Sequence, residues 1–311
     1  MRVVVFGAGA IGSVLGAYLD RAGHSVLLVA RREQVAAIRE GGIRLTGRAE
    51  GTFRVDAAEE LPPGPVPDAI FLTVKSFDLA AAAAAVARGT RPGTPVLLPQ
   101  NGLGIEEVAA RALRSGGWSD PERVLVRAVN SLPATWVRPG EVRVAGEGEM
   151  VLPEARGPSA SSIQVFERLL RDAGIRTRSV PDLRREVWKK AIVNAAVNPV
   201  TALHGVVNGR LLDSPYREEA AHLLEEAARA ARAVGIEVSD EEARADLDRV
   251  VRATAENRSS MLQDLDRGRP TEVDAISGEI LRSANGHGLD LLYTRAAVAQ
   301  IRSRVAAATR R

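Results

Sequence analysis

The sequence opens on Arg2-Val-Val-Val-Phe-Gly-Ala-Gly-Ala-Ile-Gly12, a short apolar run that leads into three glycines. The run Arg2–Phe6 predicts a buried strand, and the periodicity of Ser13–Ala22 predicts a helix after the glycines. A strand, Gly-x-Gly-x-x-Gly and a helix, in that order, are typical of a dinucleotide-binding turn. The residues that we predict to contact the dinucleotide in this turn are Gly7, Ala8, Gly9, Ala10, Ile11 and Gly12.

There is a physical reason for glycine at each of these three positions. Gly7 permits the tight turn, Gly9 lets the backbone approach the pyrophosphate, and Gly12 lets helix and strand pack closely. The phosphates then lie at the helix N-terminus, where free amides and the helix dipole favour negative charge. The alternative is a glycine-rich turn without a ligand, but the second predicted strand, Ser25–Ala30, favours the binding site.

The end of the second strand predicts which dinucleotide binds. An NAD site carries Asp or Glu about 20 residues beyond the fingerprint, where it holds the ribose hydroxyls. Here the sequence reads Ala30-Arg31-Arg32. A guanidinium suits a phosphate on the 2′ oxygen. The sequence therefore predicts NADP(H) as the cofactor, with Arg31 as the phosphate contact.

Polar side chains follow two further predicted strands. Lys75 follows the strand Asp68–Val74, and Asn101 follows the strand Pro95–Pro99. In an open α/β sheet the carboxyl ends of the strands face the ligand crevice, so we expect both residues beside the cofactor. For Asn101 an ordinary Asn-Gly turn is the alternative.

Strand signals fade in the second half of the chain. We predict a Rossmann domain over residues 1–180, an α/β fold with a mostly parallel, doubly wound sheet. Residues 181–311 are predicted to form an all-α substrate and dimerisation domain, with Pro181 at the boundary. The remaining elements predicted for the first half are helices over Glu33–Gly41, Phe77–Ala87 and Ser161–Ala173, one or two strands over Ile43–Val55, strands over Val124–Val129 and Glu141–Leu152 around a loop, and a strand over Ile175–Val180.

The predicted helix Trp188–Asn198 has an unusual polarity. Lys190, Asn194 and Asn198 recur every four residues and therefore share one face, whereas most residues between them are apolar. Buried polar groups need partners. This pattern predicts a buried helix that lines a pocket with one ammonium and two carboxamides.

Lysine is scarce in this chain. Among 42 basic residues only Lys75, Lys189 and Lys190 are lysine. A lysine differs from an arginine in that the pKa of its ammonium can be lowered until it releases a proton. Lys190 is therefore the predicted catalytic group, with a solvated helix charge as the alternative.

Composition excludes several classes of function. The net charge of +3 is spread without blocks, so nucleic acid is not indicated, and no apolar run is long enough to span a membrane. The chain has no cysteine, and its four histidines lack ligand spacing, so we predict no metal site. The absence of cysteine fits a cytoplasmic protein.

Taken together, the chain resembles the ketopantoate reductase (2-dehydropantoate 2-reductase) family over nearly its whole length. The resemblance rests on motifs in the family's order, namely Gly7–Gly12, Val74-Lys75, Gln100-Asn-Gly102, Trp188–Asn194, Asn198–Ala202, Asn208-Gly209, Asn257–Asp264 and Thr271–Asp274. It implies reduction of ketopantoate to pantoate by NADPH in pantothenate and coenzyme A biosynthesis. It also implies hydride transfer to the C2 ketone of a small keto acid. A homodimer is plausible for such helical second domains.

The resemblance also implies roles for single residues. Lys190 is the proton donor and Glu272 closes the site. Lys75 and Asn101 lie beside the cofactor. The residues that bind the keto acid and its hydroxyl are Asn194, Asn198, Asn208 and Ser260.

One loop departs from the family pattern. In Ala128–Val137 the residues Leu132, Pro133 and Trp136 are bulkier or more apolar than expected. The loop therefore leaves open a reductase of another branched 2-keto acid. Two further alternatives are a β-hydroxyacid dehydrogenase and an NADPH-binding regulator without turnover. The dehydrogenase is disfavoured because Leu183–Trp188 lacks the glycines that precede the lysine in those enzymes.

Overall fold

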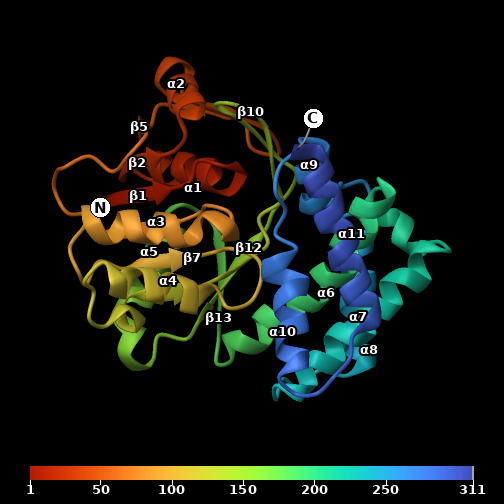
Figure 1. The fold of residues 1–311 in the computed structure, drawn as a ribbon. Helices are drawn as coiled ribbons and strands as arrows, with labels where there is room; N and C mark the ends of the chain where they lie inside the picture. The colour runs from red at the N-terminus through yellow and green to blue at the C-terminus, as the bar shows by residue number, and fades with distance from the viewer. Residues whose placement is uncertain (310–311) are drawn as a thin grey trace. The chain divides into compact units, whose positions relative to one another are not determined.

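The chain forms two compact units in the computed structural model, which describes residues 1–309 (Figure 1). The first, here called the Rossmann unit, comprises Met1–Gln100 and Ile105–Leu183. The second, here called the helical unit, comprises Arg184–Arg311 together with the short segment Asn101–Gly104. The segment that follows the fifth strand of the main sheet thus belongs to the helical unit.

The Rossmann unit is built on a six-stranded sheet in the order β5-β2-β1-β6-β7-β8. All five strand pairs are parallel. This order places the topological switch between β1 and β6, where a doubly wound sheet binds its ligand. The strands are β1 (Arg2–Phe6), β2 (Ser25–Val29), β5 (Asp56–Ala58), β6 (Ala69–Leu72), β7 (Val96–Leu98) and β8 (Leu125–Arg127).

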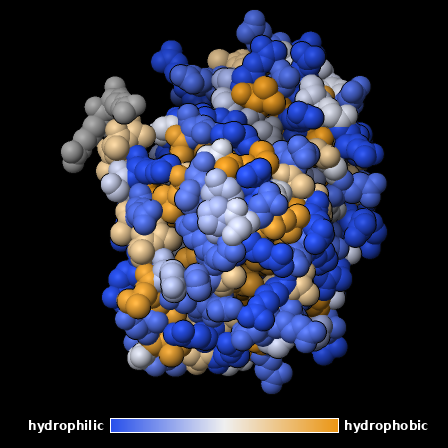
Figure 2. Space-filling model, turned by 90° about the vertical axis from the view of Figure 1, so that its right-hand side faces the viewer, coloured by the Kyte–Doolittle hydropathy of each residue, from blue (hydrophilic) through white to orange (hydrophobic). Residues whose placement is uncertain are grey.

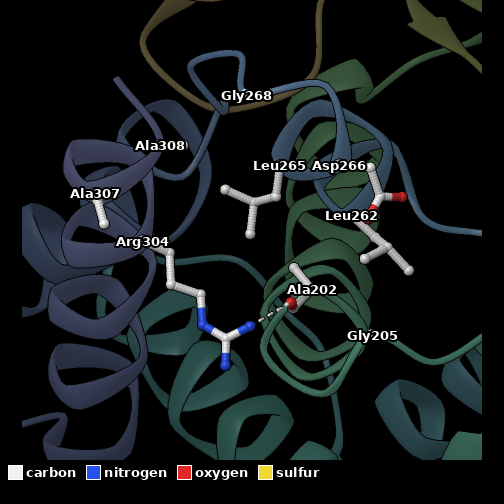
Figure 3. Close-up of a pocket in the computed structure, with 9 residues that line it drawn as sticks. All are labelled: Ala202, Gly205, Leu262, Leu265, Asp266, Gly268, Arg304, Ala307 and Ala308. Carbon is white, nitrogen blue, oxygen red and sulfur yellow. Dashed lines mark hydrogen bonds between the residues drawn. The ribbon is translucent and has the colours of Figure 1, made fainter. Parts of the chain in front are cut away.

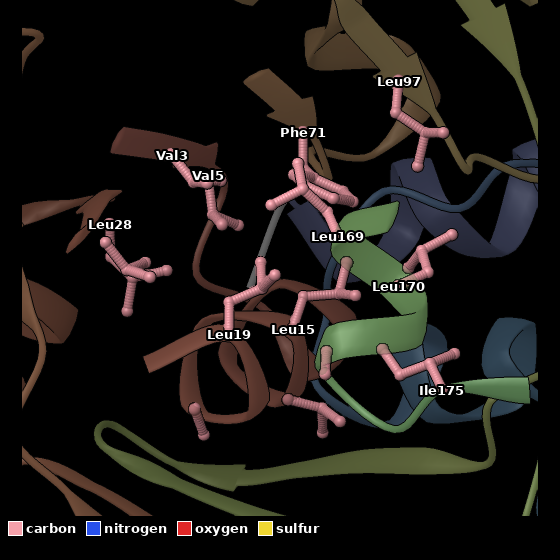
Figure 4. Packing of buried hydrophobic residues seen from close by; sticks show 14 of the residues in the cluster. Val3, Val5, Leu15, Leu19, Leu28, Phe71, Leu97, Leu169, Leu170 and Ile175 are labelled. Carbon is pink, nitrogen blue, oxygen red and sulfur yellow. The ribbon is translucent and has the colours of Figure 1, made fainter. Parts of the chain in front are cut away.

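Helices cover both faces of this sheet. Val3 and Val5 of β1 pack into the hydrophobic cluster with α1 and α5, whereas Val4 packs into the cluster with α3 and α4. The alternation arises because successive side chains of a strand point to opposite faces. Figure 4 shows Leu15 of α1 and Leu169 of α5 near Phe71 of β6. The helices are α1 (Ala10–Arg21), α2 (Arg32–Gly41), α3 (Leu79–Gly89), α4 (Ile105–Ser115) and α5 (Ala160–Asp172), with short 3₁₀ turns η1 (Ser76–Asp78), η2 (Pro121–Arg123) and η3 (Gly157–Ser159).

Two small sheets complete the Rossmann unit, and one of them contains a strand where the sequence predicts a loop. Ala134–Arg138, which lies largely inside that loop, forms strand β10 and pairs antiparallel with β11 around Pro139-Gly140. The single strand predicted over Glu141–Leu152 divides into β11 and β12, which belong to different sheets. The sheets are β10-β11-β3-β4 and β13-β12-β9, with β3 (Ile43–Gly47), β4 (Gly51–Phe53), β9 (Val129–Asn130), β10 (Ala134–Arg138), β11 (Glu141–Val144), β12 (Glu149–Pro153) and β13 (Arg176–Val180).

Two of the three bulky loop residues pack against this unit's core. Leu132 and Trp136 are partly buried and pack against the cluster around α1. The Trp136 indole Nε1 also donates a hydrogen bond to Gln34 Oε1 of α2 at 3.4 Å. Their bulk is therefore accommodated by packing within the Rossmann unit.

The helical unit contains only helical elements between residues 184 and 309, as the sequence predicted. Its core joins α6, α7, α8 and α10 in one apolar cluster, and a smaller cluster joins α6, α9 and α11. The elements are α6 (Leu183–His204), η4 (Asn208–Leu212), α7 (Tyr216–Ala233), α8 (Asp240–Ala253), α9 (Ser260–Asp266), the π-helical turn η5 (Asp274–Gly278), α10 (Glu279–Asn285) and α11 (Leu292–Thr309).

Hydrophilic side chains predominate on the face drawn in Figure 2, with apolar groups scattered among them. Single exposed apolar residues are normal for a folded protein. Among residues 1–309, no helix combines the length and the apolar character that a membrane crossing requires.

Candidate functional site

The glycine-rich turn has the geometry that its sequence predicts. Gly7 adopts φ +111°, and a Cβ on it would lie 2.6 Å from the backbone nitrogen of Val74. A Cβ on Gly12 would lie 1.9 Å from the carbonyl oxygen of Gly7. At Gly9, by contrast, a Cβ would meet no atom within 4 Å. Gly7 and Gly12 are thus required by the fold, whereas Gly9 faces open space at the N-terminus of α1.

Two side chains that were not among the predicted site residues support this region, one at the glycine-rich turn and one at the end of β6. Thr73 follows β6, and its Oγ1 donates a 2.6 Å hydrogen bond to the carbonyl of Gly7. Gln100 follows β7, and its Nε2 donates hydrogen bonds to the carbonyls of Leu72 at 2.6 Å and Val74 at 3.3 Å. Lys75 and Asn101 were predicted as site residues because each follows the carboxyl end of a strand. Thr73 and Gln100 also follow strand ends, so the same signal could have identified them.

The other two cofactor candidates of the Rossmann unit also follow strand ends. Arg31 precedes α2, its side chain is 86% exposed, and it forms a 3.0 Å ion pair with Asp78. Lys75 is partly buried and precedes the turn η1. An exposed ion pair contributes little to stability, so the Arg31 guanidinium can exchange its partner for an anion at low cost.

The polar stripe on α6 exists within the helical unit. Lys190 and Asn194 are partly buried, and Asn198 is 5% exposed. Between them Ile192, Val193 and Ala195–Val197 lie in the hydrophobic cluster of this unit. Since all three polar groups share one face of a helix, the helix presents an ammonium and two carboxamides together.

Lys189 serves a different purpose from its neighbour. Its ammonium lies 2.9 Å from a Glu242 carboxylate oxygen and 3.1 Å from one of Asp246. Burial alone would lower the pKa of Lys189, but hydrogen bonds to these carboxylates outweigh burial and raise that pKa. Lys189 is thus held as a cation that ties α6 to α8.

Asn101 and Glu272 meet in the helical unit although 171 residues separate them in the sequence. Asn101 Nδ2 donates a 3.3 Å hydrogen bond to Glu272 Oε2, and Glu272 is 6% exposed. The segment is fixed by the amide of Leu103, which donates to the carbonyl of Ala275 at 2.9 Å. Gly102 is needed there because it adopts φ +96° and its Cβ would lie 2.4 Å from that carbonyl.

The remaining two candidates differ in burial. Asn208 is 7% exposed in η4, and its Nδ2 donates a hydrogen bond to Thr254 Oγ1 at 2.9 Å. Ser260 is exposed at the first position of α9. The adjacent Ser259 is buried, caps α9 and accepts a 2.7 Å hydrogen bond from Thr201.

A cavity of about 600 Å³ lies in the helical unit near α6, α9 and α11 (Figure 3). Arg304 reaches over it, and its Nη1 donates a 3.3 Å hydrogen bond to the carbonyl of Ala202. None of the candidate site residues lines this cavity, although Ala202 and Leu262 lie in two of the family motifs. The lining residues are Ala202, Gly205, Leu262, Leu265, Asp266, Gly268, Arg304, Ala307 and Ala308.

The Rossmann unit has a parallel sheet with this glycine-rich turn, and the helical unit that follows carries the lysine and asparagine stripe. Together these features define a dinucleotide-dependent oxidoreductase. The family described as "Ketopantoate reductase PanE/ApbA" matches residues 3–157, and its C-terminal domain matches residues 182–305. The chain belongs to the ketopantoate reductase family.

Curated relatives agree with this assignment. A 2-dehydropantoate 2-reductase from Archaeoglobus fulgidus is 35% identical over 295 residues, which is 94% of this chain and 94% of that protein. One from Vibrio cholerae is 30% identical over 306 residues and 97% of each chain. Both spans include the Rossmann unit and the helical unit.

Solved structures give the same architecture. A PanE/ApbA family ketopantoate reductase from Ralstonia eutropha superposes with a TM-score of 0.87 at 30% identity, over 99% of this chain and 100% of that one. A D-mandelate dehydrogenase, solved with NADH and anilino(oxo)acetate, superposes with a TM-score of 0.91 at 23% identity over 99% of each chain. At that identity the second likeness concerns the fold alone, so architecture by itself does not select a substrate.

Proposed function

We propose that this chain is an NADPH-dependent 2-dehydropantoate 2-reductase that converts ketopantoate to pantoate. The observation that carries the proposal is the stripe of Lys190, Asn194 and Asn198 on α6, in a chain of this family. A keto acid is a small anion with a polarised carbonyl, and one ammonium followed by two carboxamides on the same helix face suits it. A homodimer and a cytoplasmic location stay predictions.

The Rossmann unit fits a nicotinamide dinucleotide. The space at Gly9 admits a pyrophosphate against the backbone, and the free amides at the start of α1 favour its charge. Arg31 is exposed at the end of β2 and would hold the 2′-phosphate. Lys75 would lie beside the cofactor. When bound, the cofactor would supply a hydride to the ketone carbon.

The helical unit would supply the proton and the positive charge. As the ketone oxygen becomes an alkoxide, the Lys190 ammonium donates a proton to it and stabilises its developing charge. Asn194 and Asn198 orient the keto acid without adding charge. Glu272 closes the site, and Asn101, which we had expected beside the cofactor, holds the Glu272 carboxylate in one orientation through its hydrogen bond.

Initial rates of NADPH consumption test the proposal. We expect ketopantoate to give the highest kcat/KM in a panel that includes other branched 2-keto acids. Activity confined to another keto acid would keep the mechanism and replace the substrate. Tight NADPH binding without consumption would favour the regulator.

Arg31→Ala tests the choice of cofactor. We expect the Kd for NADPH to rise by about 10- to 100-fold and the Kd for NADH to change little, because only NADPH carries the 2′-phosphate that a charge-assisted hydrogen bond would hold. Fluorescence titration with each cofactor measures both constants. Arg32→Ala is the matched control, since Arg32 is the exposed neighbour at the start of α2. Equal losses for the two cofactors would contradict the assigned phosphate contact.

A further inference from the structure

Gln34 is a buried residue in the first turn of α2. It is 8% exposed, and its backbone amide donates a 3.0 Å hydrogen bond to the carbonyl of Arg31, the residue that precedes this helix. The Arg31 side chain is 86% exposed, so the space that its guanidinium can reach depends on where the backbone of this turn lies. A group that fixes Gln34 therefore also fixes the base of the Arg31 side chain.

The hairpin formed by β10 and β11 holds the side-chain oxygen of Gln34. Oε1 accepts a 3.1 Å hydrogen bond from the backbone amide of Gly140 and a 3.4 Å hydrogen bond from the indole Nε1 of Trp136. Both partners can only donate, so the oxygen of the Gln34 carboxamide must face the hairpin. The hairpin turn also packs closely on α2, because a Cβ on Gly140 would lie 3.3 Å from the Cβ of Ala37. The hairpin thus determines the orientation of the Gln34 carboxamide.

The nitrogen of the same carboxamide faces the helix that carries the glycine-rich turn. Gln34 Nε2 donates a 3.5 Å hydrogen bond to Ser13 Oγ of α1, and Ser13 Oγ donates a 3.2 Å hydrogen bond to the carbonyl of Ala8. The serine hydroxyl has one hydrogen, so it acts towards Gln34 only as an acceptor. A directed series of hydrogen bonds therefore connects the hairpin, the first turn of α2 and the glycine-rich turn.

These hydrogen bonds add something that the apolar packing of α2 does not supply. Val35 and Ile38 bury the inner face of α2 in the cluster around α1. Apolar burial is non-directional, whereas a hydrogen bond weakens when its length or angle changes. Gln34 therefore provides a directional restraint on the first turn of α2, three residues after Arg31.

We infer that Gln34, held by the β10–β11 hairpin, is a positioning residue for the 2′-phosphate of NADPH, because it fixes the Arg31 backbone relative to the glycine-rich turn. The inference rests on the proposed function and deepens it. The adenosine ribose connects the 2′-phosphate to the pyrophosphate, so the two phosphate contacts need a matching spacing. A site that already has this spacing binds without an ordering cost. Trp136, whose bulk left the substrate open in the sequence analysis, then contributes to the choice of cofactor.

Gln34→Leu tests this inference. The substitution keeps a side chain of similar size and removes the hydrogen bonds to Ser13, Trp136 and Gly140. We expect the Kd for NADPH to rise by about 5- to 20-fold and the Kd for NADH to stay within about twofold, because NADH has no 2′-phosphate. Fluorescence titration with each cofactor measures both constants. A purely structural role would weaken the two cofactors alike, or would lower only the melting temperature.

The double variant Arg31→Ala, Gln34→Leu shows whether Gln34 acts through Arg31. If it does, Gln34→Leu should change the Kd for NADPH by less than about twofold in the Arg31→Ala background, because no guanidinium is left to position. Fold-changes that multiply would mean that the two residues act independently, and would overturn the inference.

Trp136→Phe tests the same restraint from the hairpin and serves if Gln34→Leu does not fold. It removes the indole N–H and leaves the Gly140 amide in place, so we expect the Kd for NADPH to rise by about 2- to 5-fold and that for NADH to stay unchanged. Trp118→Phe is the matched control. Trp118 is buried in the Rossmann unit, its Nε1 has no hydrogen-bond partner among residues 1–309, and the substitution should change neither Kd. Equal NADPH binding by wild type and Trp136→Phe would overturn the role of the hairpin.

The outcomes separate the inference from the function on which it rests. If Arg31→Ala weakens NADPH and NADH equally, the proposed phosphate contact fails and the inference fails with it. If Arg31→Ala weakens NADPH selectively and Gln34→Leu does not, the proposed function stands and the positioning role of Gln34 is wrong.

Discussion

Lys190→Ala is expected to lower kcat for keto acid reduction by about two to four orders of magnitude, the range that a general acid contributes. The substitution removes both the proton donor and the cation that stabilises the alkoxide. The Kd for NADPH should stay nearly unchanged, because all the phosphate contacts that we propose belong to the Rossmann unit. Steady-state kinetics and a separate NADPH titration measure the two effects.

The adjacent lysine supplies a control for this experiment. Lys189→Ala removes an ammonium from the same helix, but that ammonium is engaged by Glu242 and Asp246. We expect it to lower the free energy of unfolding while kcat stays close to the wild-type value. If Lys190→Ala also left turnover intact, Lys190 would have no place in the mechanism, whatever the fate of Lys189→Ala.

Gly9→Ala should abolish most cofactor binding while leaving the fold intact. The backbone at Gly9 has φ −75° and ψ −158°, which alanine adopts without strain, and its Cβ would touch no protein atom within 4 Å. The same Cβ would occupy the space in which we propose that the pyrophosphate lies. We expect the Kd for NADPH to rise by about 100-fold, or roughly 2.8 kcal/mol.

Alanine substitutions at two other glycines serve as controls for this experiment. Gly64→Ala is the matched control, because a Cβ there also meets nothing within 4 Å and Gly64 lies outside the turn. It should change neither the Kd for NADPH nor the melting temperature. Gly7→Ala is the opposite case, since φ +111° and a 2.6 Å approach to Val74 disfavour any side chain, so it should lower the melting temperature. Unchanged NADPH binding in Gly9→Ala would show that the pyrophosphate does not lie against this residue.

Local patterns predicted the elements that hold most of the candidate site residues. The strand Arg2–Phe6 and the helix that follows its glycines could be predicted because periodicity and glycine spacing act over a few residues. The stripe on α6 could be predicted for the same reason, since residues four apart share a face. Strand β10 was not predicted because Ala134–Arg138 is extended through its pairing with β11. The Pro139-Gly140 turn between the two strands was interpreted as part of a loop.

Contacts between distant residues could not be predicted in this way. The place of Asn101 after a strand predicts that it lies beside the cofactor, and this stays a prediction. Its hydrogen bond to Glu272 could not be predicted, because only the folded chain brings the two residues together. Thr73 meets Gly7 across 66 residues and Thr254 meets Asn208 across 46, without any motif that links the members of each pair.

The sequence alone predicted the strand, glycine-rich turn and helix at the start of the chain, an arginine at the end of the second strand and the polar face of α6, because each depends on neighbours within a few residues. The tertiary structure decided which distant side chains hydrogen-bond to the candidate site residues: Thr73 at the glycine-rich turn, Asn101 at Glu272 and Thr254 at Asn208. These pairings depend on how strands and helices pack. A hydrogen bond has a fixed length and direction, and sequence spacing does not specify either one across a fold.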